Sequence, residues 1–186
     1  MKVAVFGGSF NPPHVAHALA VVLVLATEDV DRVLVVPAYQ HPFGKPLAPF
    51  EDRVAMCALA MGWIAGVEVS RVEENLGGES RTLRTLEHLA SVHPDWHLRL
   101  VLGADILAEA PRWFGFDAIA RLAPPIVLAR AGVDSSGGAE RKRLPLVSST
   151  DVRGKIAAGA WDELASMVPR RVLEYVRAKG LYGAPA

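Results

Sequence analysis

Cysteine is nearly absent from this 186-residue sequence, which contains Cys57 alone. A single cysteine cannot form an internal disulfide, so a disulfide framework is excluded and a reducing compartment is expected. Cys57 lies in an apolar stretch with helical spacing, Arg53–Met61, and we predict that it is a buried hydrophobic residue and not a reactive thiol. The chain is 51% apolar, which is enough to bury a core without a structural metal.

Net charge is absent as well, because 20 Lys and Arg residues offset 20 Asp and Glu residues. A protein whose affinity depends on a broad cationic face needs an excess of basic residues, so nucleic acid is not an expected partner. The balance still allows a small polyanion to be held in a local pocket.

Long hydrophobic runs are missing too. The longest run near the N-terminus, Ala18–Ala26, is too short to span a bilayer. No charged segment leads into an apolar stretch with a cleavage site, so no signal peptide is predicted. We therefore expect no membrane association and a cytoplasmic location, while the oligomeric state is not indicated.

Short apolar runs alternate with helical patterns along the whole chain. The predicted strands are residues 2–6, 32–36, 67–71, 97–102, 125–129 and 144–147. The predicted helices are residues 14–27, 50–63, 82–92, 105–110, 115–122, 149–159 and 169–179. This order and the continuous apolar character of the strands favour an α/β fold, a parallel sheet with helices on both faces. No linker separates two parts, so residues 1–186 are predicted to be one domain.

Ligands of open parallel sheets bind at the carboxyl ends of the strands, near the point where the strand order reverses. The segments that follow the predicted strands are therefore the candidates for a binding site: residues 7–17, 37–45, 103–113 and 147–153.

The first of these segments, Gly7–His17, has the most distinctive sequence. Its two glycines allow backbone amides to approach a ligand closely, and the helix that follows favours an anion at its first turn. His14 and His17 are three residues apart and share one face of that helix. Spacing alone leaves two interpretations of this pair open, metal ligands or ordinary helix residues. The segment is neither a Gly-x-Gly-x-x-Gly fingerprint nor a Walker P-loop.

The last segment, Ser148–Arg153, follows a strand and opens a helix. Ser, Thr and Asp commonly cap helices in this way. Three hydroxyl groups with an arginine one turn later could equally hold phosphates, and spacing alone does not decide between the two interpretations.

Both segments match motifs of one family. Gly8–His17 resembles the G(S/T)F(D/N)PxHxGH signature of the HxGH nucleotidyltransferases, and Val147–Arg153 resembles their carboxyl-terminal ISSTxxR motif. The two motifs occur in the expected order, which makes a chance match very rare.

Further landmarks resemble the bacterial nicotinate-nucleotide adenylyltransferases in particular, and the resemblance covers nearly the whole chain. These landmarks are Pro37, Lys45, Arg53–Met56, Thr82–Leu86, Gly103–Asp105, Trp113, Gly159, Val168–Pro169, Tyr175 and Gly180–Tyr182. Two features depart from the family pattern. Ala16 replaces the usual glycine between the histidines, where we expect slight crowding of the nucleotide, and the 131–143 connection is short.

The resemblance implies transfer of AMP from ATP to nicotinate mononucleotide, with release of pyrophosphate, in NAD biosynthesis. It implies that the phosphate groups are contacted by His14, His17, Lys45 and Arg153 as the catalytic residues. ATP would further contact Gly7, Gly8, Ser9, Phe10, Gly103, Asp105, Ser149 and Thr150, and helices near 149–179 would complete its site. Mg²⁺ would be bound mainly through the ATP phosphates, with no metal site made by protein side chains alone.

For the mononucleotide, the resemblance implies a site made of three residues. Trp113 would stack on the pyridine ring, Thr85 would help to bind the ring carboxylate, and Arg130 would hold the phosphate. Each has an ordinary alternative, as a core residue, a helix residue and a solvated strand end respectively. Three other readings of the function stay open: nicotinamide mononucleotide as acceptor, phosphopantetheine as acceptor, and a nucleotide-binding module without activity.

Overall fold

The computed structural model describes residues 1–41, 44–104, 106, 113–130 and 143–184. Its centre is a parallel sheet with the strand order β3-β2-β1-β4-β5-β6. The strands are β1 (Lys2–Gly8), β2 (Arg32–Pro37), β3 (Val67–Val69), β4 (His97–Gly103), β5 (Pro125–Arg130) and β6 (Arg143–Leu144). Every neighbouring pair is parallel, which confirms the predicted α/β fold.

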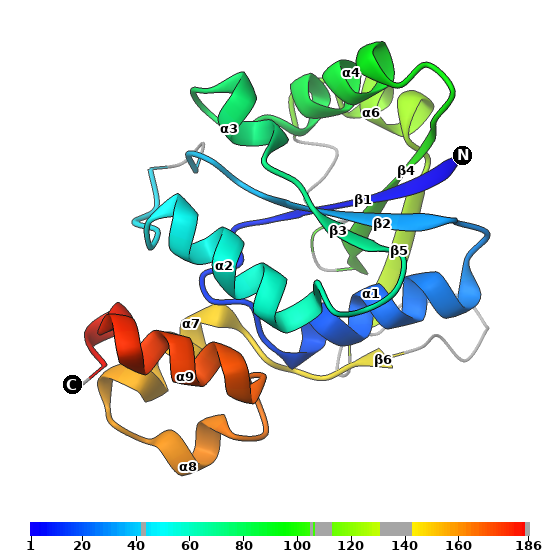
Figure 1. The fold of residues 1–186 in the computed structure, drawn as a ribbon. Helices are drawn as coiled ribbons and strands as arrows, with labels where there is room; N and C mark the ends of the chain where they lie inside the picture. Colours follow the sequence, from blue (N-terminus) through cyan, green and yellow to red (C-terminus); the bar gives the residue numbers. More distant parts are fainter. Residues whose placement is uncertain (42–43, 105, 107–112, 131–142, 185–186) are drawn as a thin grey trace.

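Helices cover both faces of this sheet, as Figure 1 shows. The helices α3 (Val72–Leu76), α4 (Thr82–Val92) and α6 (Phe116–Leu122) lie on one face, and α1 (Val15–Thr27) and α2 (Phe50–Met61) lie on the other. The last helices, α7 (Ser149–Ala157), α8 (Trp161–Leu164) and α9 (Arg170–Lys179), follow beside α1 and α2, and a 3₁₀ turn η2 (Leu181–Gly183) ends the described chain.

Two hydrophobic cores correspond to the two faces. One joins the sheet to α1, α2, α7 and α9, and it contains Val24, Met56, Cys57, Val152 and Val172. The other joins the sheet to α4 and α6 through Leu86, Leu89 and Ile119. Cys57 is fully buried, so the prediction of a buried cysteine is confirmed, and burial raises the pKa of its thiol.

Most predicted elements are present, with shifted ends. The strand predicted at residues 144–147 is the main error, because β6 ends at Leu144. Pro145 has no N–H to donate and cannot continue the ladder. Two helices were not predicted, α3 and α8, and both are too short for an apolar period to be visible. The helix predicted at 105–110 lies almost entirely outside the described residues.

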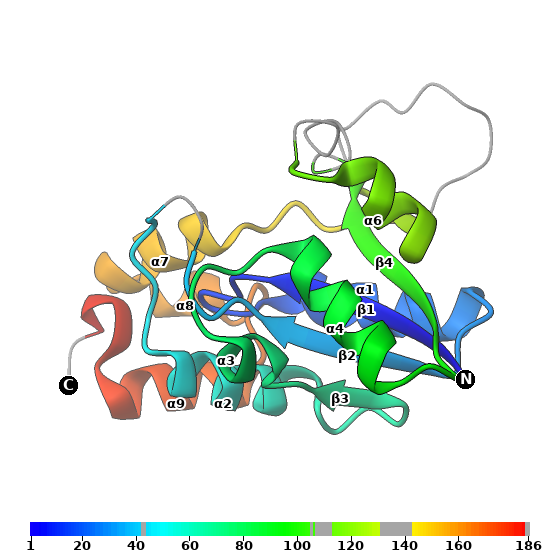
Figure 2. The same ribbon diagram turned by 90° about the horizontal axis from the view of Figure 1, so that it is seen from above.

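The carboxyl ends of the strands all point to one side of the molecule, where the C-terminal helices begin (Figure 2). The strand order reverses between β1 and β4, since β2 follows on one side of β1 and β5 on the other side of β4. This reversal creates the place where open α/β sheets bind ligands. In the described part of the chain, no helix is long and apolar enough to cross a membrane.

Candidate active site

A cavity of about 580 Å³ opens at the carboxyl ends of β1 and β4, which is within the usual size range of small-molecule sites. Seven of the predicted site residues contribute to its wall: Gly7, Gly8, Ser9, His17, Thr85, Gly103 and Trp113. They come from two of the four segments expected at strand ends, 7–17 and 103–113, and from the start of α4. The structure therefore brings seven of the residues predicted from the sequence together around one cavity.

The loop after β1 (residues 9–13, called the β1 loop below) is held by a buried phenylalanine. Phe10 is 2% exposed, and its ring lies edge-on to Phe6, with 5.5 Å between centroids. It also contacts His17, at 4.9 Å, and a Cβ on Gly8 would meet the ring at 3.2 Å. The side chain of Phe10 thus belongs to the core, so only its backbone can reach a ligand.

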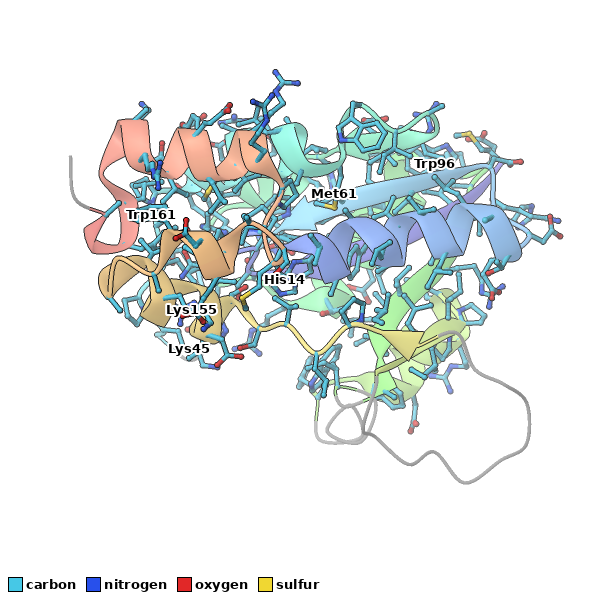
Figure 3. All side chains as sticks on the ribbon, turned by 90° about the horizontal axis from the view of Figure 1, so that it is seen from below. His14, Lys45, Met61, Trp96, Lys155 and Trp161 are labelled. Atoms are coloured by element: carbon cyan, nitrogen blue, oxygen red, sulfur yellow. The ribbon has the colours of Figure 1, made fainter. Side chains whose placement is uncertain are left out.

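The two histidines adopt different positions at the start of α1. His14 caps the helix and is 2% exposed, whereas His17 lines the large cavity. Their rings are stacked with 3.8 Å between centroids, and Figure 3 shows His14 where α1 begins. The His14 backbone N–H donates to Nδ1 of His17 over 3.1 Å. A nitrogen that accepts carries no proton, so neutral His17 is protonated on Nε2 and donates from there.

Asn11 joins the β1 loop to two distant segments. Its Oδ1 accepts from the backbone N–H of Ala48 and from the hydroxyl of Tyr182, both at 2.9 Å. Its Nδ2 donates to the carbonyl of Pro46 over 3.4 Å. Asn11 is 4% exposed, so these bonds are shielded from water. Lys45, which immediately precedes Pro46, is exposed and is not part of the cavity wall.

Arg53 of α2 supports the same region from inside. It is 1% exposed, and its Nη1 donates to the carbonyls of Ser9, at 3.1 Å, and Ala38, at 2.6 Å. Its Nε donates to Ala48 over 2.9 Å and its Nη2 to Tyr39 over 3.3 Å. These acceptors lie after β1, after β2 and before α2, so one guanidinium fixes three loops that surround the cavity.

The first turn of α7 also packs against the β1 loop. The hydroxyl of Ser149 donates to the carbonyl of Pro12 over 2.8 Å. Arg153 donates to the carbonyl of Asn11 over 2.7 Å and to Oγ1 of Thr150 over 3.3 Å. Ser148, one residue before the helix, is the residue that caps it, through the Asp151 N–H. The segment therefore caps a helix and also places Arg153 beside the β1 loop.

The opposite side of the cavity is formed by α3, α4 and Trp113. Thr85 is 3% exposed, its hydroxyl donates to the carboxylate of buried Glu73, and its Oγ1 lies 3.2 Å from the Arg81 carbonyl oxygen. Trp113 is partly buried against the core beneath α4. Glu73 and Arg81 also line the cavity. This wall combines an aromatic ring with buried polar groups, although Thr85 presents little surface.

His41 lines the cavity as well, close to Lys45. Burial, and then the positive charge of Lys45, lower the pKa of His41 below its ordinary value. The charge of Lys45 therefore acts on a residue of the cavity wall, although Lys45 itself is not part of that wall.

Two predicted residues cannot be placed. Asp105 and the side chain of Arg130 lie outside the described part of the structure, as does the connection 131–142. Among the described residues, no group of three or more His, Cys, Asp or Glu side chains is arranged to hold a metal ion. His14 and His17 therefore have no third side chain of these types beside them there.

Comparison with known proteins shows the family to which the chain belongs. Residues 5–155 match the cytidylyltransferase-like family. A relative from Anaeromyxobacter dehalogenans (strain 2CP-C), named "Probable nicotinate-nucleotide adenylyltransferase", is 48% identical over 97% of this chain and 96% of its own length. A relative of the same name from Myxococcus xanthus is 43% identical over 98% and 95%. The chain belongs to the nicotinate-nucleotide adenylyltransferases. It is therefore a nucleotidyltransferase.

A solved structure supports the same fold. The chain matches Plasmodium falciparum nicotinic acid mononucleotide adenylyltransferase complexed with NaAD with a TM-score of 0.85, over 99% of this chain and 98% of that one. The sequence identity is 16%, so this likeness concerns the arrangement of the elements.

Sequence analysis missed three residues that organise this nicotinate-nucleotide adenylyltransferase site. Asn11, Arg53 and Tyr182 each lie in a motif that resembles the family, yet none was given a role. Apart from the bond from Arg53 to Ala48, which spans 5 positions, their bonds join residues between 14 and 171 positions apart. No local pattern could reveal such bonds, although the presence of these residues in family motifs was a signal.

Proposed function

We propose that the cavity binds ATP and nicotinate mononucleotide and that the chain transfers AMP from the first to the second. The products are nicotinate adenine dinucleotide, a precursor of NAD, and pyrophosphate. One observation carries the assignment of residues: groups suited to phosphate, Gly7–Ser9 and His17, share one cavity with Trp113 and Thr85, which suit an aromatic acid. The family relationship supplies the reaction.

The reaction requires alignment more than proton transfer. An oxygen of the mononucleotide phosphate attacks the α-phosphorus of ATP, and the bond from that phosphorus to the α,β-bridging oxygen breaks. Pyrophosphate leaves with the electron pair. The attacking oxygen is already an anion near neutral pH, so no general base is needed. Negative charge grows on the α-phosphate and the leaving group, and fixed donors and cations lower the barrier.

His17 is the residue that we assign to the α-phosphate, because its protonated Nε2 can donate and its ring lines the cavity. His14 is buried behind it and orients it, through the stacked rings and the bond to Nδ1. The backbone of Gly7–Phe10 would supply amides to the phosphates. Oriented amides and a fixed imidazole need little rearrangement during the reaction, which is the source of their effect.

The distal phosphates are assigned to Lys45, Arg153, Ser149 and Thr150. Arg153 and Ser149 already contact the β1 loop, which supports a role for the C-terminal helices in completing the ATP site of a single domain. The charge of Lys45 acts on His41, which lines the cavity. Both cations would offset charge on the leaving pyrophosphate.

Mg²⁺ would be bound by the phosphates of ATP and by water. Around the β1 loop the described residues offer amides, imidazoles and cations, without a carboxylate cluster, and Mg²⁺ commonly keeps its water in such sites. When bound, the ion would neutralise part of the triphosphate charge. The side chains named above would hold and orient the phosphates.

The remaining contacts follow the family pattern. Gly103, at the end of β4, lines the cavity and would let the adenosine approach, with Asp105 on its ribose. Trp113 would stack on the pyridine ring, Thr85 and nearby amides would bind the ring carboxylate, and Arg130 would hold the phosphate. We propose that the enzyme works in the cytoplasm on these small molecules.

The test is release of pyrophosphate from ATP and Mg²⁺ with three acceptors at equal concentration: nicotinate mononucleotide, its amide and phosphopantetheine. We expect a strong preference for the nicotinate compound. A preference for the amide would keep the nucleotidyl transfer and overturn the assignment of Thr85 to the ring carboxylate. A preference for phosphopantetheine would also overturn the assignment of Trp113 to a pyridine ring. No release with any acceptor would favour a nucleotide-binding module.

A further inference from the structure

Two tyrosines near the C-terminus donate hydroxyl hydrogen bonds to different parts of the molecule. Tyr182, in the turn η2, donates to Oδ1 of Asn11 over 2.9 Å. Tyr175, in α9, donates to Oδ1 of Asp52 over 2.7 Å. Asp52 lies in the first turn of α2 and is not part of the cavity wall. Of these two tyrosines, Tyr182 is therefore the one whose hydroxyl connects the C-terminal turn to the β1 loop.

The backbone of Tyr182 is adapted to this contact. Its φ is +60°, in the left-handed region, which costs a residue other than glycine free energy. Gly180, two residues before Tyr182, has the same φ and ends α9. The chain therefore reverses there toward the N-terminal part of the molecule. A strained residue persists when its surroundings compensate for it, and the bond to Asn11 contributes to that compensation.

Asn11 links Tyr182 to a third part of the chain, the segment directly after Lys45. The same oxygen, Oδ1, also accepts from the backbone N–H of Ala48, and Nδ2 of Asn11 faces the carbonyl of Pro46. The amide plane of Asn11 is thus defined by one partner in the C-terminal turn and two in the segment directly after Lys45. A change at Tyr182 would allow this plane to rotate and the 46–48 segment to shift.

We propose that Tyr182 is a positioning residue for ATP: its hydroxyl orients Asn11, and Asn11 holds the 46–48 segment so that Lys45 reaches the triphosphate. This proposal rests on the proposed function, in which Lys45 neutralises the phosphates. It assigns a role in substrate binding to the turn that ends the described chain.

The electrostatic surroundings suit a donor at this place. Burial raises the pKa of Tyr182, although the nearby charges of Arg53 and Arg153 lower it in part. The hydroxyl therefore keeps its proton at neutral pH and continues to donate to Asn11.

The experiment compares Tyr182→Phe with Tyr175→Phe in steady-state assays of pyrophosphate release. Both changes remove one hydroxyl from the C-terminal segment, so Tyr175→Phe is a matched control. Because one hydrogen bond is lost, we expect Tyr182→Phe to raise the KM for ATP about 3- to 10-fold. The KM for nicotinate mononucleotide should change less than about 2-fold. Tyr175→Phe should leave both KM values near those of the wild type.

A double-mutant cycle with Lys45→Ala tests whether the effect passes through Lys45. We expect Lys45→Ala to raise the KM for ATP, and Tyr182→Phe to add less than about 2-fold in that background. Three results would overturn the proposal: the full effect of Tyr182→Phe without Lys45, equal effects of the two tyrosine variants, or no effect of Lys45→Ala. Activity of the wild type on nicotinate mononucleotide is measured first, so failure of the proposed function would be seen separately.

Discussion

At the scale of single residues, the site depends on how His17 is oriented. Its Nδ1 accepts from the His14 backbone, its ring stacks on His14 and it touches Phe10. The ring is therefore restrained on several sides before any substrate binds. Such restraint is what makes a donor effective toward a developing charge.

We predict that His17→Ala lowers kcat about 10²- to 10³-fold, the usual loss when one oriented donor is removed. His93→Ala is the control, because His93 stacks on Trp96, and Figure 3 shows Trp96 well away from His14. Pyrophosphate release measures kcat, and circular dichroism verifies the fold. If folded His17→Ala turned over like the wild type, His17 would have no part in catalysis.

The second prediction at this scale concerns charge. Burial and then Lys45 lower the pKa of His41, because both disfavour the imidazolium form. Lys45→Met removes the second cause and leaves the first, so the pKa of His41 should rise and still remain below its ordinary value. An NMR titration of the His41 ring measures this, with Lys155→Met as the control. A pKa of His41 that does not change in Lys45→Met would place the ammonium away from the cavity.

At the scale of elements, helix α1 explains the departure at Ala16. The family usually has glycine there, and crowding of the nucleotide was expected. In the structure Ala16 is 3% exposed and belongs to the core beneath the sheet. It is not among the residues of the large cavity wall, and the space beside it is a small void of about 30 Å³. The same void is lined by His14, His17 and Gly103, so the methyl group lies beside residues assigned to ATP, and slight crowding of the nucleotide stays a prediction.

Because the expected crowding is slight, Ala16→Gly should cost stability with little change in activity. Glycine inside a helix is about 1 kcal/mol less favourable than alanine, so the free energy of unfolding in urea should fall by roughly that amount. The kcat and the KM for ATP should stay within about 2-fold of the wild type. A several-fold gain in kcat/KM for ATP would show that the methyl group crowds the nucleotide more than slightly.

At the scale of the whole molecule, the two ends of the sequence build one site. The β1 loop begins it, and the first turn of α7 and the turn η2 return to that loop after more than 130 residues. The buried Arg53 also donates hydrogen bonds to the carbonyls of Ser9 and Ala38, directly after β1 and β2. The β1 loop is thus supported by elements from early, middle and late parts of the sequence, which favours one cooperative unit.

The amino-acid sequence alone determined the class of fold, the order of most elements and the family. Apolar strands and amphipathic helices are recognised from residues that are close together in the sequence. The β1 loop and the start of α7 are likewise short motifs that can be identified without the rest of the fold. The same local character explains the seven predicted residues around the cavity, because strand ends of a parallel sheet meet at one edge.

Only the tertiary structure decided which side chains hold that edge together. Phe10 proved to be a core residue, Ala16 is buried in the core beneath the sheet, and Asn11 accepts a hydrogen bond from Tyr182, which lies 171 positions further along the chain. Hydrogen bonds and packing act over a few ångströms in space, whatever the separation in sequence, so they emerge only when the folded chain brings their partners together.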